Sequence, residues 1–76
     1  MALIRKLENV ELEHASPHTE VEGTFSIIVD EQGCKYLQVD TYGSKDRQIV
    51  GKKSQSIRFA PEAIRQLKAI LADNGL

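Results

Sequence analysis

Two runs in which apolar and polar residues alternate dominate the middle of the chain, at residues 24–30 and 35–42. Their alternating apolar positions are Phe25, Ile27, Val29, Leu37 and Val39. Alternation with a period of two is typical of β-strands that have one apolar face. Between the runs, Asp30 and Gly33 stand at the first and last positions of a four-residue type I turn. The pattern therefore predicts a β-hairpin.

The last third of the chain predicts a further strand and then a helix. The strand covers about residues 53–59, with Ile57 and Phe59 directed inward. Pro61 suits the first position of a helix, because its missing N–H would have no partner there. The apolar stripe of this helix consists of Ile64, Leu67, Ile70 and Leu71. Gly75 then provides the stop.

The first 18 residues give a mixed signal. Four apolar residues have helical spacing, namely Leu3, Ile4, Leu7 and Val10. Val10 and Leu12, however, alternate with glutamates as in a strand, which favours a strand from about Asn9. Pro17 favours a loop over residues 14–18, because it removes a ladder donor and restricts the residue before it.

Strands followed by one C-terminal helix define an α+β protein. We expect a single domain over residues 1–76, in which residues 1–18 have no assigned structure and residues 19–76 form the functional module. The expected architecture is a curved antiparallel sheet of three to four strands followed by the helix. One helix covers only one face of such a sheet, so the other face meets solvent, a second subunit or a ligand.

The short chain predicts a homodimer. Domains of this size bury only about 60% of their unfolded surface and usually need a disulfide, a metal or a partner subunit. Cys34 is the single cysteine, so no internal disulfide can form, and His14 and His18 do not match a zinc spacing. We expect no cofactor and no metal.

The number of cysteines and the hydropathy of the sequence indicate the cellular compartment of the protein. A single cysteine favours a reducing compartment. No apolar run approaches the roughly 20 residues that a membrane span needs, and no signal-peptide pattern opens the chain. These features predict a cytoplasmic or nucleoid-associated protein without a membrane partner.

The net charge of −1 conceals two oppositely charged segments. Residues 1–32 carry two basic side chains against seven carboxylates, whereas residues 43–58 carry five basic side chains against Asp46 alone. Segregated charge of this kind indicates an anionic partner for the basic segment. The alternative is a solvated loop whose lysines keep the protein soluble.

Polar and aromatic residues alternate with the apolar ones on the predicted strands. These outward positions are Tyr36, Gln38, Tyr42, Ser54, Ser56 and Arg58, and we expect them to form the open face of the sheet. Cations beside exposed aromatic rings suit single-stranded nucleic acid, because cations follow the phosphates while unpaired bases stack on the rings. Alternatively, Tyr36 and Tyr42 cover a dimer interface, and Arg58 pairs with a carboxylate across the sheet.

The order of these residues resembles the positive-cofactor-four family of transcriptional coactivators, including its small bacterial and phage type. The resemblance covers about residues 23–71. It rests on Leu37-Gln-Val-Asp-Thr-Tyr42, the basic Gly51-Lys52-Lys53, Ile57-Arg-Phe59, then Pro61-Glu62 and Leu67-Lys68. The chain departs from the family pattern at Glu31 and Gly43, where the family often has aromatic residues.

The resemblance implies a homodimer that binds single-stranded DNA in channels formed by its sheets. Lys52 and Lys53 match the basic run before the last strand, and Tyr42 matches the aromatic residue that closes the strand before it. Together with the charge and face arguments, this gives a set of nucleic-acid-binding candidates: Lys35, Tyr36, Tyr42, Lys45, Arg47, Lys52, Lys53, Gln55 and Arg58. The process served is transcription regulation, replication, recombination or repair, with transcription or replication proteins as further partners and RNA as an alternative ligand.

An enzyme is not expected. Gly43 and Gly51 are too far apart for a phosphate-binding loop, and Cys34 has no histidine near it in sequence. Asp30 and Asp40 lie on neighbouring strands, where a solvated pair is the simpler interpretation. The second functional hypothesis is a protein–protein adaptor that docks an acidic partner on the open face.

Overall fold

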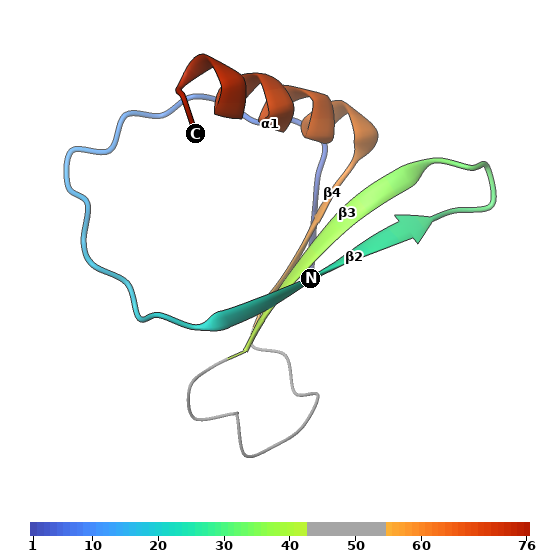
Figure 1. The fold of residues 1–76 in the computed structure, drawn as a ribbon, viewed down its shortest axis with the longest axis horizontal. Coiled ribbons are helices and arrows are strands. Elements are labelled where there is room, and N and C mark those ends of the chain that lie inside the picture. The colour runs from blue at the N-terminus through green and yellow to red at the C-terminus, as the bar shows by residue number, and fades with distance from the viewer. Residues whose placement is uncertain (43–54) are drawn as a thin grey trace.

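The computed structural model describes residues 1–42 and 55–76 and has the predicted α+β layout (Figure 1). Four strands precede one helix: β1 (Ala2–Ile4), β2 (Glu22–Val29), β3 (Lys35–Tyr42), β4 (Gln55–Phe59) and α1 (Pro61–Asp73). The strands form a single sheet in the order β1-β4-β3-β2. The predicted hairpin and C-terminal helix are confirmed.

The hairpin β2–β3 is antiparallel and follows the predicted alternation, because Phe25 faces Val39 and Ile27 faces Leu37 across the ladder. At the turn, the Gly33 N–H donates to the Asp30 carbonyl oxygen at 3.1 Å. Gly33 has a φ of 83°, a conformation that glycine adopts without steric cost. The Asp30 carboxylate also accepts backbone N–H groups, so the turn is fixed by its own residues.

The expected strand from about Asn9 is wrong, because residues 5–21 form neither helix nor strand. Val10 and Leu12 are 74% and 77% exposed, since no strand lies beside them to cover them. The N-terminal strand is instead β1, which pairs in parallel with the outer edge of β4. The sheet is therefore mixed, with antiparallel pairing among β2, β3 and β4 only.

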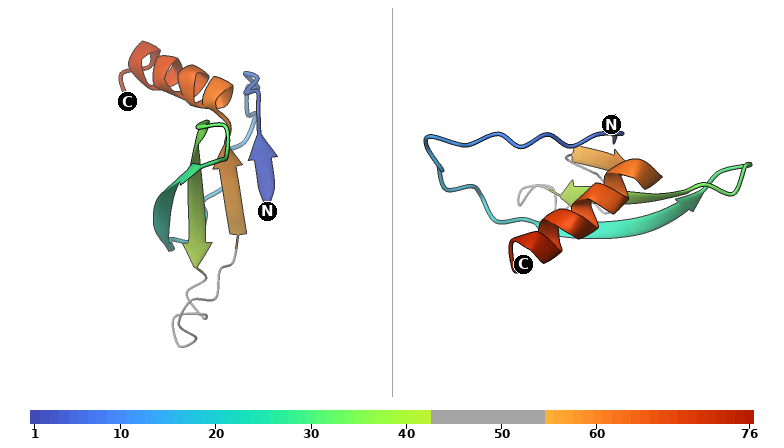
Figure 2. Two further views of the ribbon diagram at one scale, coloured as in Figure 1. Left: turned by 90° about the vertical axis from the view of Figure 1, so that its right-hand side faces the viewer. Right: turned by 90° about the horizontal axis from the view of Figure 1, so that it is seen from above.

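The helix crosses one end of the sheet and leaves most of the sheet uncovered (Figures 1 and 2). It begins at Pro61, as predicted, after Ala60 in extended conformation. Ala60 and Ala63 are fully buried where the helix leaves β4, whereas Ile70 and Leu71 near its other end are each 40% exposed. The apolar stripe of the helix is thus only partly covered.

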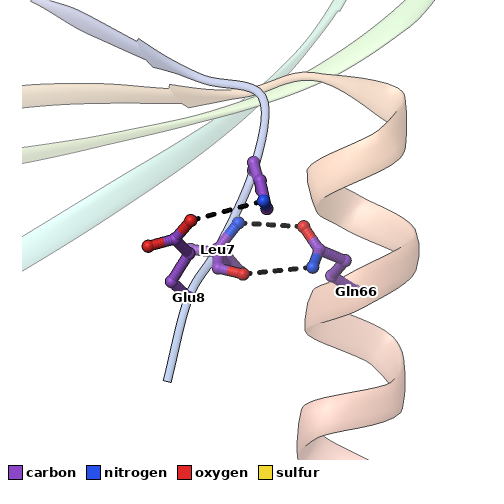
Figure 3. A network of polar contacts seen from close by, with 4 residues as sticks. Leu7, Glu8 and Gln66 are labelled. Carbon is purple, nitrogen blue, oxygen red and sulfur yellow. Dashed lines mark hydrogen bonds and ion pairs between the residues drawn. The ribbon is translucent and has the colours of Figure 1, made fainter. Parts of the chain in front are cut away.

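A side-chain amide attaches the N-terminal segment to the helix (Figure 3). The Leu7 N–H donates to Gln66 Oε1 at 2.9 Å, and Gln66 Nε2 donates to the Leu7 carbonyl oxygen at 3.1 Å. Lys6 and Glu8 form an exposed ion pair beside this contact, with 3.3 Å between Nζ and Oε1. The two hydrogen bonds hold the chain after β1 against α1.

The side chains on the two faces of the sheet are not exposed in the way that the sequence predicts. Phe25, Ile27 and Val29 share one face as predicted, but they are 74%, 59% and 57% exposed, because the helix packs mainly against β3 and β4. On the opposite face, Gln38 and Asp40 are 5% and 2% exposed. The sequence predicts that the polar face is the open face of the sheet. That prediction is wrong at the centre of this face, where Gln38 and Asp40 are buried.

We call the first surface the apolar face. It consists of Phe25, Ile27, Val29, Leu37, Val39, Ile57 and Phe59, which the strand register places on the same side of the sheet. Leu37, Val39 and Phe59 are half-buried. In the part of the chain that the structure describes, no helix is long and apolar enough to span a membrane.

Candidate nucleic-acid interface

The surface opposite the apolar face carries polar side chains in register, and we call it the polar face. One row across the strands contains Ser26, Gln38 and Arg58, and the next contains Thr24, Asp40 and Ser56. Tyr36 and Tyr42 lie on the same side, because they stand an even number of positions from Gln38 on β3. Three predicted binding residues, Tyr36, Tyr42 and Arg58, therefore share one face.

A chain of hydrogen bonds crosses the centre of the polar face. Gln38 Nε2 donates to both carboxylate oxygens of Asp40, at 3.1 and 3.2 Å, and the Ser56 hydroxyl donates to Asp40 Oδ1. Arg58 Nε and Nη2 donate to Gln38 Oε1 at 3.0 and 2.6 Å. The buried Asp40 is thus satisfied by Gln38 of its own strand and Ser56 of β4, which explains why a carboxylate is tolerated there.

Arg58 is held by a neutral group and keeps its charge available. A guanidinium has five N–H donors, and two of them serve Gln38. No ion pair joins Arg58 to a carboxylate within residues 1–42 and 55–76. The side chain is half-buried and positioned, and its remaining donors can meet an anion.

Tyr36 lies in a hollow at the edge of the polar face. Its hydroxyl donates to Asp30 Oδ2 at 3.2 Å. Desolvation, followed by the hydrogen bond to Asp30 and the charge of that carboxylate, raises the pKa of Tyr36 above its ordinary value of 10.0. The phenol therefore stays protonated at neutral pH and can act as a donor.

The hollow has a volume of about 310 Å³, and its lining residues lie on or next to each of the four strands. Its lining consists of Met1, Leu3, Ile28, Asp30, Tyr36 and Arg58. Four of these residues, Met1, Leu3, Ile28 and Asp30, were not among the predicted site residues. Ile28 follows Ile27 directly, so it interrupts the alternation and is an apolar residue on the polar face, a signal that the sequence does contain.

Tyr42 occupies the other end of β3. Its hydroxyl lies 3.2 Å from Thr24 Oγ1, and the side chain is half-buried. Glu22 is its partner across the ladder. Part of the Tyr42 ring therefore remains accessible on the same face as Arg58.

The remaining candidates do not join this group. Lys35 pairs with Val29 and Gln55 pairs with Thr41, so the register places both on the side of the apolar face, where they are exposed. The other four candidates, Lys45, Arg47, Lys52 and Lys53, lie outside the described residues. They belong to the segment that joins the end of β3 to the start of β4.

The predicted proximity of Asp30 and Asp40 gives no carboxylate pair. Asp30 bonds to its own turn and to Tyr36, whereas Asp40 bonds to Gln38 and Ser56. Among the described residues, no group of three histidine, cysteine, aspartate or glutamate side chains is arranged to hold a metal ion.

Comparison with known proteins identified no relative: no family model, no curated protein and no solved structure matches this chain.

Proposed function

We propose that this protein binds single-stranded DNA on the polar face of its sheet and acts as a homodimer in transcription regulation, replication, recombination or repair. The observation that carries this proposal is the common placement of Tyr36, Tyr42 and Arg58 on one face. A fixed guanidinium binds phosphate, and accessible aromatic rings accept unpaired bases at about 1–3 kcal/mol per base. The basic segment 43–54 joins the ends of the two strands that carry these groups.

The apolar face supports the homodimer. A folded monomer of 8.5 kDa exposes about 4,650 Å² according to the scaling of surface with mass, whereas this chain exposes 6642 Å². The extended residues 5–21 contribute part of the excess, and the uncovered apolar side chains of β2 contribute another part. The uncovered side chains of β2 are therefore apolar surface that a second copy can bury, as in obligate homodimers.

A second copy is the occupant that the apolar face favours. Its centre is aliphatic and uncharged, and the flanking Lys35 and Gln55 stand at its margins. Obligate homodimer interfaces have this apolar character, and a two-fold axis places the same patch on both partners. Pairing through this face leaves both polar faces available to DNA.

The adaptor hypothesis makes a different prediction about the same surface. A docked acidic protein would use the charge of Arg58 but would not need the rings of Tyr36 and Tyr42. Binding to an oligonucleotide therefore separates the two functions.

The test is an anisotropy titration of a labelled single strand, compared with the duplex of the same sequence. We expect tighter binding of the single strand, and a loss of affinity of about 10- to 150-fold in Arg58→Ala, since a charge-assisted contact contributes about 1.5–3 kcal/mol. Arg65→Ala is the matched control, because Arg65 is exposed on α1. The absence of oligonucleotide binding by the wild type would reject the proposal.

Salt dependence provides a second readout of the same titration. Each phosphate neutralised contributes a slope of roughly −0.7 to log K against log salt for a single strand. Replacing Lys52 and Lys53 by alanine should remove four contacts from a dimer and flatten the slope by about 3 units. An unchanged slope would show that these lysines do not contact the strand.

A further inference from the structure

We propose that the hollow beside Tyr36 is a subsite for a single unstacked nucleobase of the bound strand. This inference rests on the proposed function and assigns a separate task to the residues of the hollow. The basic segment holds phosphates, and the hollow receives a base that has turned out of the strand. Arg58 borders the hollow and has donors for both a phosphate and the base.

The size of the hollow fits one small planar group. Its volume of about 310 Å³ is at the lower end of the 300–1,000 Å³ that ligand pockets occupy. A run of stacked bases needs an open surface, whereas one extruded base needs a bounded pocket. The hollow is therefore suited to a single base within a longer strand.

The walls match the two kinds of surface that a base presents. Leu3, Ile28 and the ring of Tyr36 provide apolar and aromatic contact for the flat faces. Ile28 and Tyr36 are ladder partners on the hairpin, and Leu3 is the ladder partner of Arg58. The strand register thus brings these side chains together from opposite edges of the sheet.

Polar groups of opposite charge stand at the same hollow and match the edge of a base. Asp30 Oδ1 accepts two backbone N–H groups at 2.9 Å, while Oδ2 accepts only the Tyr36 hydroxyl among the described residues. A carboxylate oxygen has two lone pairs, so Oδ2 can accept a further N–H. Arg58 supplies donors from the other side. Every nucleobase carries N–H donors and carbonyl or ring-nitrogen acceptors on its edge.

The polar face also makes the subsite rigid. Asp40, at 2% exposure, fixes the Gln38 amide, and that amide fixes Arg58 through two hydrogen bonds. Asp30 is fixed by its own turn. A base therefore meets donors and acceptors whose positions are set before it binds, which lowers the entropic cost of binding.

The experiment compares an ordinary single strand with a strand of the same length that carries abasic deoxyribose phosphates throughout. Anisotropy titrations with the full chain measure the affinity for both. We expect the wild type to bind the ordinary strand about 5- to 150-fold more tightly, which corresponds to 1–3 kcal/mol per accepted base. Tyr36→Ala should lower this ratio by about 5-fold or more, the contribution of one base, and leave the affinity for the abasic strand unchanged.

Three further variants test whether the preference for the ordinary strand depends on the residues of the hollow. Tyr36→Phe keeps the ring and should keep most of the ratio. Leu3→Gln alters the opposite wall at a residue that is already 46% exposed, so it tests the hollow even where Tyr36→Ala destabilises the fold. Leu12→Gln is the matched control for Leu3→Gln, because Leu12 is 77% exposed and lies outside the hollow, and it should leave the ratio unchanged.

The outcomes separate this inference from the proposed function. Equal binding of the ordinary and abasic strands by the wild type would overturn the base subsite while leaving DNA binding intact. If both Tyr36→Ala and Leu3→Gln keep the wild-type ratio of the two affinities, the base contacts lie elsewhere. That result would also overturn the base subsite. Failure to bind either strand would overturn the proposed function and the subsite together.

Discussion

At the scale of single residues, the most consequential side chain is the buried carboxylate of Asp40. It accepts hydrogen bonds from Gln38 and Ser56, which come from its own strand and from β4. Gln38 in turn orients Arg58, so a group that is itself inaccessible positions the cation of the candidate site. Asp40 therefore contributes to the stability of the sheet and, through Gln38, to the proposed binding of DNA.

Replacing Asp40 by alanine should destabilise the protein by about 1–3 kcal/mol, because buried donors of Gln38 and Ser56 lose their acceptor. Urea unfolding followed by circular dichroism measures this change. Asp73→Ala is the control, since Asp73 is exposed at the end of α1 and its removal should change stability by less than about 0.5 kcal/mol. Equal effects of the two substitutions would contradict the role given to Asp40.

Tyr36 predicts a dependence of stability on alkaline pH. Its pKa is raised in the folded protein, so the folded state holds the phenolic proton more tightly than the unfolded state. This contribution is fully present below a pH of about 10 and is lost as the pH rises through the raised pKa. Tyr36→Phe should show a smaller loss of stability above pH 10 than the wild type, in denaturant titrations at several pH values.

Asp30→Asn tests the cause of the same pKa shift. The substitution removes the carboxylate charge but leaves desolvation, which is the largest contribution, in place. The pKa of Tyr36 should therefore fall towards 10.0 without reaching it. An ultraviolet titration measures it, with Tyr36→Phe identifying the signal. An unchanged pKa in Asp30→Asn would contradict the contact between the two side chains.

At the scale of elements, the contact between Gln66 and Leu7 joins the N-terminal segment to the helix. Each of its two hydrogen bonds contributes about 0.5–1.5 kcal/mol. Gln66→Ala should therefore speed hydrogen exchange at the Leu7 amide by at least about 5-fold, measured by nuclear magnetic resonance. Lys68→Ala is the control, because Lys68 is an exposed residue of the same helix. Equal exchange rates in the two variants would show that Gln66 does not protect the segment.

The sequence predicted the elements whose signals are local. The hairpin has its alternation and its turn residues within a short stretch, and the helix has Pro61 and an apolar stripe. The strand β1 has only three residues, and its partner lies near the other end of the chain. No local pattern distinguishes such a strand from the helical spacing around it.

The sequence predicts the part of the candidate site that follows from the alternation of side chains along a strand, because successive side chains lie on opposite faces of the sheet. This alternation places Tyr36, Tyr42 and Arg58 on one face. It places Lys35 and Gln55 on the other face. The exposure of each face was not predictable, because it depends on the direction that α1 takes after Phe59 (Figure 2). The hollow also required β1, which supplies Leu3.

At the scale of the whole molecule, the apolar face predicts the oligomeric state. Phe25→Glu should convert the proposed homodimer to a monomer, because it places a charge among the aliphatic residues that a second copy would cover. Light scattering coupled to size exclusion should give twice 8.5 kDa for the wild type and 8.5 kDa for the variant. Val10→Glu is the matched control, since Val10 is also 74% exposed but lies outside the apolar face. A monomeric wild type would contradict the assignment.

The parallel pairing of β1 with β4 also fixes an order of events during folding. Ala2 pairs with Ile57, so 54 residues separate the two partners, whereas the hairpin partners Val29 and Lys35 are close neighbours in sequence. Contacts between distant residues require closure of a long loop and form late. During synthesis, β1 must therefore wait for β4 before it can pair. The wall of the hollow that contains Leu3 accordingly cannot be completed in a nascent chain before β4 has been synthesised.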